Sequence, residues 1–483
     1  DVFRPEDNGT GQNGNFYPEC YIIPLDGKNQ TNLQAAADMM EWLTRNDVKV
    51  NVTEKEFTYD GVTYPAGTMI VSMISQAFVA NGALYDGTLI NGWTILYSEG
   101  ITSFNETRGF DMVTVAGRAY KSISAVCGDA MDHDDALAYT KALTSCFTGD
   151  KNKDVILSNA SEDSTAAVNE LLKAGKTVGM VTSGDHMAIH LLYADYQTVA
   201  GKYLLSAAGV DKTSVKAKII TKSPTVYVPG TPAESEKGFV YTPQISQSAG
   251  WNYDTAAMNL MGFTTTSDVT KADAAAGATK LDAAAKTAVE NGCRTSVTAI
   301  PQRPPPLTSS PAWNTPSWTR DGLLTPVVYP NKTLVNASYI ADGDGILYAY
   351  GLGYFSKVPA SATVLVKSDK SERLPSFIPT NTAERAAGFK AYMNGGVQGF
   401  AYKENGMNVV LFANSLTHKV HQRDEYAYLS NFLFSSVLGD KNYDGSASLP
   451  LPMRDDAYYA DAVVWAVAKN ITSGATATTF APN

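Results

Sequence analysis

Charged residues are scarce in this 483-residue sequence, and basic residues are fewer than acidic ones. Asp, Glu, Lys and Arg make up 18% of the chain, and 48 acidic against 38 basic residues give a net charge of −10 at pH 7. No cluster of Lys and Arg is long enough to follow a phosphate backbone, so nucleic acid is not an expected partner. No apolar run reaches about 18 residues, so the sequence predicts no transmembrane segment.

Histidine is also scarce, which limits metal chemistry. A zinc peptidase needs two or three His or Glu ligands at short spacing and a Glu that activates the bound water. Neither HExxH nor HxxE occurs among the five histidines. His186 and His190 are four residues apart, with no Glu between them and no evident third ligand, so we favour a role other than metal binding. His418 and His421, with Asp424 beyond them, are interpreted as a polar pair in a loop.

Motifs for covalent catalysis and for nucleotide binding are missing as well. A nucleophile elbow reads GxSxG at a turn between a strand and a helix. Ser183 follows a predicted strand but lacks the preceding Gly, and Cys293 follows a predicted helix. No GxGxxG or Walker pattern opens a helix. We therefore predict no catalytic residue and no organic cofactor.

The sequence has four cysteines, Cys20, Cys127, Cys146 and Cys293, which are too scattered for a zinc knuckle. Cys127 and Cys146 are close enough in sequence to form a disulfide across a short loop. Buried free thiols are the alternative.

The apolar content is sufficient for two or three domains, each with its own core. Hydrophobic residues make up 44% of the chain, which is ordinary for a globular protein. The Gly- and Asn-rich residues 1–18 resemble a connector, and the abrupt start at Asp1 suggests a processed or trimmed chain. High contents of Tyr, Asn, Thr and Gly with few charges favour an extracellular location.

Residues 405–438 form the stretch around which the rest of the chain is expected to fold. Residues 409–412 are a continuous apolar run, as expected of a strand that is buried on both faces. From Asp424 onward apolar residues recur at helical spacing, and Gly439 is expected to end the helix. A central strand followed by a packed helix is typical of the closing unit of an α/β layer.

Residues 1–149 are predicted to form an N-terminal α/β domain. A strand at 20–24, a helix capped by Thr31 or Asn32 and a strand at 48–52 indicate a βαβ unit. Residues 57–59 and 62–64 flank Asp60 and Gly61, a dipeptide that favours a tight β-hairpin. Another strand is expected at 68–73.

Residues 150–438 are predicted to form a second α/β domain. A strand at 155–157, a helix capped by Ser161 and a strand at 177–181 indicate a right-handed crossover in a parallel, flavodoxin-like sheet. Residues 301–318 hold six prolines and are read as an insertion that Trp313 and Trp318 pin in place. The remaining predictions are strands at 217–220, 225–228, 345–355 and 363–367, and helices near 252–261 and 279–291.

One polar segment is a candidate calcium site. Asp440, Asn442 and Asp444 match the first half of an EF-hand loop, but position twelve is Leu451 instead of Glu. Residues 150–154 repeat the spacing. Polar turns after helices produce the same pattern without a metal, so calcium is a hypothesis here.

The chain also contains eight Asn-x-Ser/Thr sequons, which are candidates for N-linked glycosylation. A chain rich in Asn, Ser and Thr has several by chance, so they support secretion only weakly. The sequons lie at Asn8, Asn29, Asn51, Asn105, Asn159, Asn331, Asn336 and Asn470.

The tail, residues 455–483, reads DDAYYADAVVWAVAKNITSGATATTFAPN and resembles the start of an S-layer homology repeat. An opening helix, an ITSG turn and a TFxPN segment occur in register. The family's next segment, Thr-Arg-Ala-Glu, carries much of its binding to cell-wall polymer and is not reached before Asn483. The resemblance therefore implies wall anchoring for the parent protein, through its C-terminal repeats.

Residues 17–438 resemble the region downstream of the catalytic domain in secreted Gram-positive zinc carboxypeptidase-like proteins. The segments that carry the resemblance are YIIPLDGKNQTN (21–32), VTYPAGTMIVSM (62–73), VNELLKAGKTVGMVTSGD (168–185), VYVPGTPAE (226–234) and VVLFANSLTHKVHQRDEY (409–426). In that family an HxxE pair and a later His hold zinc in an N-terminal domain, and no such residues occur in this chain. The resemblance implies an amidotransferase-like shape for the second domain, which is not evidence of that activity.

Taken together, these observations predict a non-catalytic, extracellular structural or assembly protein of a bacterial surface. Such a protein would self-associate as the subunit of a lattice, sheath or filament, and residues 439–483 would be a linker and a partial repeat. One alternative is the accessory C-terminal half of a secreted zinc carboxypeptidase. Another is a cell-wall or carbohydrate-binding module that uses exposed Tyr and Trp.

Overall fold

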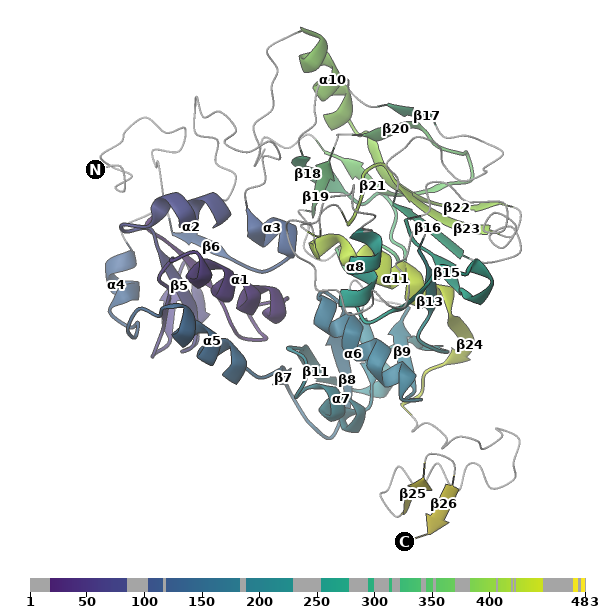
Figure 1. Cartoon of the computed structure of the whole chain (residues 1–483), viewed down its shortest axis with the longest axis horizontal. Coiled ribbons are helices and arrows are strands. Elements are labelled where there is room, and N and C mark those ends of the chain that lie inside the picture. Colours follow the sequence, from purple (N-terminus) through teal and green to yellow (C-terminus); the bar gives the residue numbers. More distant parts are fainter. Residues whose placement is uncertain are drawn as a thin grey trace.

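The chain has a mixed α/β architecture in which most strand pairs are antiparallel (Figure 1). Three larger sheets, of four, seven and eleven strands, organise the part of the chain that the computed structural model describes. The described residues are 18–84, 103–115, 119–182, 188–228, 253–277, 294–298, 312–314, 322–339, 345–350, 353–369, 383–404, 407–417, 420, 423–445, 472–476 and 479–482.

The first layer is a four-stranded sheet with its own apolar core, to which α1 and α5 contribute. Its strand order is β2-β5-β1-β6, and every pair is antiparallel. The predicted βαβ unit is therefore present, but β5 is inserted between its two parallel strands. The elements are β1 (Cys20–Ile23), α1 (Leu33–Arg45), β2 (Asn51–Val52), β3 (Phe57–Tyr59), β4 (Val62–Tyr64), β5 (Met69–Ser72), α2 (Ala77–Leu84), α3 (Phe104–Arg108), β6 (Val113–Val115), α4 (Tyr120–Ser124) and α5 (His133–Ala142).

Two local predictions for this layer are confirmed. The Asn32 side chain accepts a hydrogen bond from the Ala35 amide at 3.0 Å, which caps α1. Strands β3 and β4 pair as an antiparallel hairpin. Asp60 and Gly61 have φ angles of 46° and 77°, which a type I′ turn requires at both central positions.

The second layer is a seven-stranded sheet with the order β24-β12-β9-β10-β8-β11-β7. Within it, β8, α6, β9, β10, α7 and β11 follow the β-α-β-β-α-β order of ferredoxin-like folds, and their strands lie in the order β9-β10-β8-β11. Its elements are β7 (Cys146–Thr148), β8 (Asp154–Ser158), α6 (Glu162–Lys173), β9 (Val178–Val181), β10 (Ala188–Leu191), α7 (Tyr193–Val199), β11 (Ser206–Val210), β12 (Ala217–Ile220) and β24 (Leu438–Asn442).

This arrangement corrects the expected parallel sheet at residues 154–181. The strands β8 and β9 and the helix α6 occur as predicted, but β8 and β9 are not neighbours. Strand β10 lies between them and is antiparallel to both. The sequence analysis predicts no strand at residues 188–191, and it therefore places β8 and β9 next to each other.

The third layer is an eleven-stranded sheet, and five of its strands are parallel. These lie in the order β14-β13-β15-β16-β23, which is 2-1-3-4-5 in chain order. The sheet continues through antiparallel strands β22, β21, β18 and β19, and β17 and β20 pair beside them. Its elements are β13 (Thr225–Tyr227), α8 (Tyr253–Leu260), β14 (Thr264–Thr266), β15 (Ala274–Ala275), β16 (Arg294–Thr298), β17 (Ala312–Asn314), β18 (Gly322–Val328), β19 (Gly345–Tyr350), β20 (Tyr354–Lys357), β21 (Thr363–Ser368), α10 (Ala383–Met393), β22 (Val397–Glu404), β23 (Met407–Phe412), the 3₁₀ helix η8 (Arg423–Glu425) and α11 (Tyr426–Ser436).

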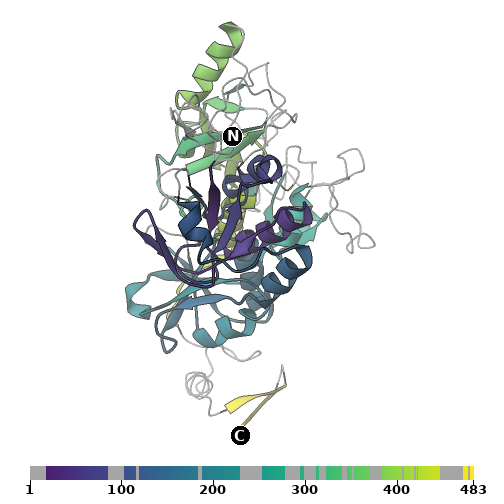
Figure 2. The same ribbon diagram turned by 90° about the vertical axis from the view of Figure 1, so that its left-hand side faces the viewer.

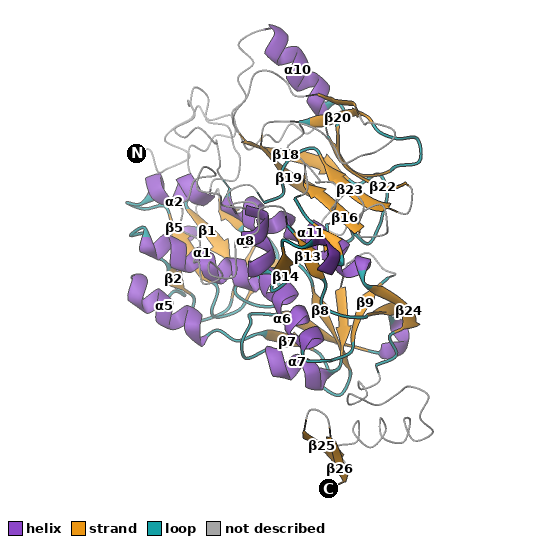
Figure 3. Cartoon of the chain, turned by 45° about the vertical axis from the view of Figure 1, so that its right-hand side comes forward, coloured by secondary structure: helices purple, strands orange, loops and turns teal. Residues whose placement is uncertain are grey.

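The stretch at 405–438 is central, as predicted. Strand β23 is the last of the parallel strands, and residues 426–434 of α11 are all buried. Phe412 of β23 packs against Tyr428 of α11 with ring centroids 4.9 Å apart. Helices α6, α8 and α11 lie between the second and third layers, which share one apolar core (Figure 3). Helix α11 ends at Ser436 and β24 begins at Leu438, so Gly439 lies in a strand and does not end the helix.

Two segments at predicted domain boundaries join the second sheet. Strand β7, within the predicted N-terminal domain, pairs with β11 of that sheet, while Cys146 also packs against the core of the first layer. Residues 439–442, predicted to begin the linker, belong to β24, which pairs with β12 at the edge of the same sheet. In the tail, β25 (Thr472–Thr476) and β26 (Thr479–Pro482) pair as antiparallel strands, so the described residues of the ITSG segment, 472–474, lie in a strand and not in the predicted turn.

Other predictions are confirmed or lie outside the described residues. The strands at 217–220 and 225–228 and the helix near 252–261 are present, and the strand expected at 345–355 is divided between β19 and β20. The helix at 279–291 and Trp318 lie outside the described residues, and Trp313 is in β17. Among the described helices, none has the length and apolar character needed to span a bilayer.

Candidate functional site

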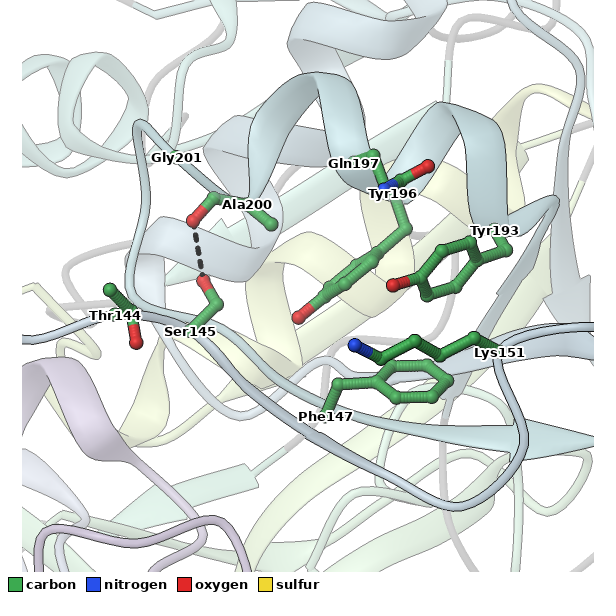
Figure 4. Close-up of a pocket in the computed structure, with 9 residues that line it drawn as sticks. All are labelled: Thr144, Ser145, Phe147, Lys151, Tyr193, Tyr196, Gln197, Ala200 and Gly201. Carbon is green, nitrogen blue, oxygen red and sulfur yellow. Dashed lines mark hydrogen bonds between the residues drawn. The ribbon is translucent and has the colours of Figure 1, made fainter.

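An open cleft of about 430 Å³ lies between β7 and α7 at the edge of the second layer (Figure 4). Three aromatic rings form its walls. The Phe147 ring meets the Tyr193 ring at 5.1 Å and 73°, and the Tyr196 ring at 5.6 Å. We call this site the tyrosine cleft, and its lining residues are Thr144, Ser145, Phe147, Lys151, Tyr193, Tyr196, Gln197, Ala200 and Gly201.

The walls of the tyrosine cleft are fixed by hydrogen bonds from the loop before β7. The Ser145 hydroxyl lies 2.9 Å from the Ala200 carbonyl oxygen and accepts a hydrogen bond from the Leu205 amide at 3.0 Å. Tyr196 is only 4% exposed, and burial raises the pKa of its phenol to about 12. Tyr196 is therefore a neutral, fixed wall, whereas Tyr193 and Phe147 are half-buried.

A second polar site, the interlayer charge cluster, lies where the three layers meet. Arg423 of η8 is 3.3 Å from the Glu162 carboxylate of α6 and 3.7 Å from the Asp38 carboxylate of α1. Arg108, at the end of α3, lies over the Phe104 ring at 4.5 Å. Figure 2, in which the first layer faces the viewer, shows that layer in front of the other two.

The electrostatics of this cluster follow from burial. Burial lowers the pKa of Arg108 to about 10, and the nearby Arg423 acts in the same direction. Burial also raises the pKa of Glu162, while Arg423 opposes that shift. Asp163 follows Glu162, and burial raises its pKa to about 6 although its carboxylate accepts a hydrogen bond from the Leu204 amide. The cluster therefore holds opposite charges that depend on one another for their ionised states.

A third polar site contains His190, the histidine of β10. Its Nε2 is 2.9 Å from the Asp154 carboxylate, and its ring packs against Tyr443 with centroids 4.5 Å apart. Burial lowers the pKa of His190, and Asp154 opposes that shift. The His190 Nδ1 and the Tyr443 hydroxyl are buried, and neither has a hydrogen-bond partner among the residues that the structure describes.

The carboxyl ends of the parallel strands bring together residues from two loops and from the first turn of α8. The Thr417 hydroxyl, after β23, donates to the Asp254 carboxylate at 2.7 Å. Gly277, after β15, has a φ of 69°, and a Cβ at this position would overlap the Asp254 carboxylate. Ligands of open parallel sheets bind at this edge, where the strand order reverses.

The predicted metal sites are not assembled among the described residues. Asp440 and Asn442 lie in β24, in extended backbone that does not form the expected calcium-binding loop. Within the part of the chain that the structure describes, no group of three or more His, Cys, Asp or Glu side chains could hold a metal ion. His186, His418 and His421 lie outside the described residues, as do the nucleophile candidates Ser183 and Cys293.

The predicted disulfide between Cys127 and Cys146 is wrong for this structure, because both are free thiols. Cys127 forms a β-bridge with Thr53 in the first layer, whereas Cys146 is in β7 of the second layer. Burial raises the pKa of both thiols, which keeps them protonated and weakly nucleophilic.

Two of the glycosylation candidates are incompatible with the folded chain. Asn159 is 1% exposed and Asn336 is 0% exposed. The Asn159 amide donates to Asn431, and the Asn336 amide donates to the Leu365 carbonyl. Asn331 is exposed, and Asn29, Asn51 and Asn105 are half-buried. Asn8 and Asn470 lie outside the described residues.

Sequence reasoning missed both the tyrosine cleft and the interlayer charge cluster. Tyr193 and Tyr196 are three residues apart in a helix, a spacing that puts two side chains on one face and could have indicated the cleft. The charge cluster had no such signal, because residues 38, 108, 162 and 423 are far apart in the sequence. The sequence matches no protein-family model and no curated protein, so the two resemblances remain predictions.

Proposed function

We propose that this chain is a non-catalytic scaffold unit of an extracellular bacterial surface assembly. The observation that carries the proposal is the interlayer charge cluster, in which Arg423 joins Glu162 and Asp38. A lattice or filament subunit must keep its contact surfaces in a fixed relation to one another. Ion pairs that join all three layers, together with the core shared by the second and third layers, support such rigidity.

We also propose that part of the third layer has a flavodoxin-like fold. The parallel strand order 2-1-3-4-5 supports a flavodoxin-like layer within residues 225–412, downstream of the expected position. The carboxyl edge of this layer is where a ligand of such a fold would bind. Two of its polar groups, Asp254 and Thr417, are hydrogen-bonded to each other, which supports a structural use of this edge.

The test uses the complete encoded protein, purified with and without calcium. We expect multi-copy, regular assemblies by light scattering and negative-stain electron microscopy. Arg423→Gln should reduce their long-range order, whereas Arg45→Gln, which removes an exposed pair with Glu41 on α1, should not. Monomeric protein would overturn the scaffold proposal, and zinc-dependent release of C-terminal amino acids from peptides would favour the accessory half of a carboxypeptidase.

Glycan binding is a second candidate function, and the tyrosine cleft favours it. Small-ligand sites combine aromatic walls with a few polar groups in volumes of roughly 300–1,000 Å³. The cleft, at about 430 Å³, falls within that range. In a scaffold protein at the cell wall, glycan bound at this cleft would help to hold the protein to the wall.

A further inference from the structure

We infer that the tyrosine cleft binds a pyranose ring that carries a carboxylate, as part of an acidic glycan. This inference deepens the glycan-binding function and does not depend on assembly into a lattice. It rests on three properties of the cleft, which are the angle between its rings, its unpaired polar groups and its single charge.

The rings favour a sugar over a flat ligand. Phe147 and Tyr193 meet at 73°, so the cleft is a corner and not a pair of parallel faces. A planar base could stack on only one of these rings. A pyranose chair presents C–H groups on its faces, and these groups complement the negative face of an aromatic ring. Burying a sugar ring in this corner would use both walls.

The polar groups around the corner are available to a ligand. The Tyr193 hydroxyl, the Gln197 amide and the Thr144 hydroxyl make no hydrogen bond to any residue within the described ranges. A side-chain amide both donates and accepts, and a hydroxyl does the same. This set matches the hydroxyl groups at the rim of a pyranose, which need donors and acceptors side by side.

The single charged group of the cleft favours a sugar that carries a carboxylate. Lys151 is the one charged residue among the described lining residues, and it makes no ion pair within them. Figure 4 shows its side chain running alongside the Phe147 ring. An ammonium group at the rim favours a carboxylate on the ligand, in a chain whose net charge of −10 would otherwise repel it.

The cleft is also preformed, which lowers the cost of binding. The Ser145 hydroxyl ties the loop before β7 to the end of α7, and the buried Tyr196 cannot change its position without breaking the packing of α7. A ligand would therefore order few side chains, chiefly Lys151 and Gln197, both of which are exposed.

The test is isothermal titration calorimetry of the full chain with trigalacturonate and with its methyl ester, in which each carboxylate is replaced by an uncharged group that is larger by one methyl. We expect trigalacturonate to bind and the ester to bind about fivefold more weakly, the upper range for an exposed ion pair. Lys151→Gln should abolish this preference. Its matched control is Lys153→Gln, because Lys153 pairs with Asp211 outside the cleft.

The aromatic wall is tested separately. Tyr193→Ala should weaken binding of both sugars about tenfold, whereas Tyr59→Ala in the β3–β4 hairpin should not. If Tyr193→Ala fails to fold, Gln197→Ala at an exposed position replaces it. Equal binding of acid and ester, or unchanged affinity in the Tyr193 and Gln197 variants, would overturn the inference. Because sugar binding at the cleft does not require assembly, failure here leaves the scaffold proposal intact.

Discussion

Replacing Arg423 by Gln tests whether the interlayer charge cluster holds the layers together. The Arg423 side chain is 28% exposed and that of Glu162 is 5% exposed. Removing one partner of a fully buried ion pair costs about 3–5 kcal/mol, because the other charge stays buried and unpaired. Since water reaches Arg423, we expect a smaller loss in the free energy of unfolding, roughly 2 kcal/mol at pH 7.

The loss should depend on pH. Burial raises the pKa of Glu162, so the folded chain holds this proton more tightly than the unfolded chain does. A group with a raised pKa destabilises the folded state increasingly as the pH rises through that pKa. Without Arg423 the pKa of Glu162 rises further, so Arg423→Gln should lose less stability at pH 5 than at pH 7.

The assay is urea unfolding of the full chain, with hydrogen exchange to report on α1 and α6 locally. A double-mutant cycle with Glu162→Gln isolates the Arg423–Glu162 pair, because it compares the loss of Arg423 with and without the Glu162 carboxylate while Asp38 is present in all four proteins. Arg45→Gln, at an exposed i,i+4 pair, is the control and should change stability by less than ~0.5 kcal/mol. If Arg423→Gln reduced the free energy of unfolding by the same amount with and without the Glu162 carboxylate, the reasoning would be refuted.

Three further predictions concern the second layer and the sequons. Burial lowers the pKa of His190 in the folded chain. The stabilising contribution of the neutral ring is therefore complete above the ordinary pKa of 6.5 and is lost as the pH falls through the lower folded-state pKa. We expect His190→Gln to show a smaller fall in melting temperature between pH 7.5 and 5.5 than the unmodified chain. A Cβ on Gly179 would lie 2.6 Å from the Tyr443 ring, so Gly179→Ala should destabilise the chain by about 1–3 kcal/mol in urea unfolding, whereas Gly201→Ala, with nothing within 4 Å, should not. Glycopeptide mass spectrometry of secreted protein should find the buried sequons Asn159 and Asn336 unmodified, whereas the exposed Asn331 is open to modification.

Local sequence patterns predicted the local structure well. The dipeptide Asp60-Gly61 placed the hairpin, and the strand at 217–220 has the predicted bounds. These features depend on φ preferences and on apolar spacing within a few residues, which the sequence carries directly. The capping interaction of Asn32 with α1 belongs to the same class.

The candidate sites were predicted much less well, because they depend on contacts between distant segments. The calcium hypothesis treated residues 440–444 as a loop, but β12, more than 200 residues earlier, pairs with Leu438 and Asn442 of β24. Strand pairing holds the backbone of residues 438–442 extended, whereas an EF-hand loop needs this backbone to turn around the ion. Similarly, no local pattern could place Arg423 beside both Asp38 and Glu162.

Strand β10 explains why the sequence predicted buried strands in the second layer correctly but predicted parallel instead of antiparallel pairing. All four residues of β10 are buried, as are all four of β9. A strand buried on both faces gives a continuous apolar pattern, which is typical of parallel sheets because helices cover both of their faces. Here α6 and α7 contribute to the core on one face, whereas Tyr443 and its neighbours cover part of the other. The same apolar pattern therefore arises in an antiparallel sheet. Burial alone cannot fix strand direction, which depends on the pairing partner.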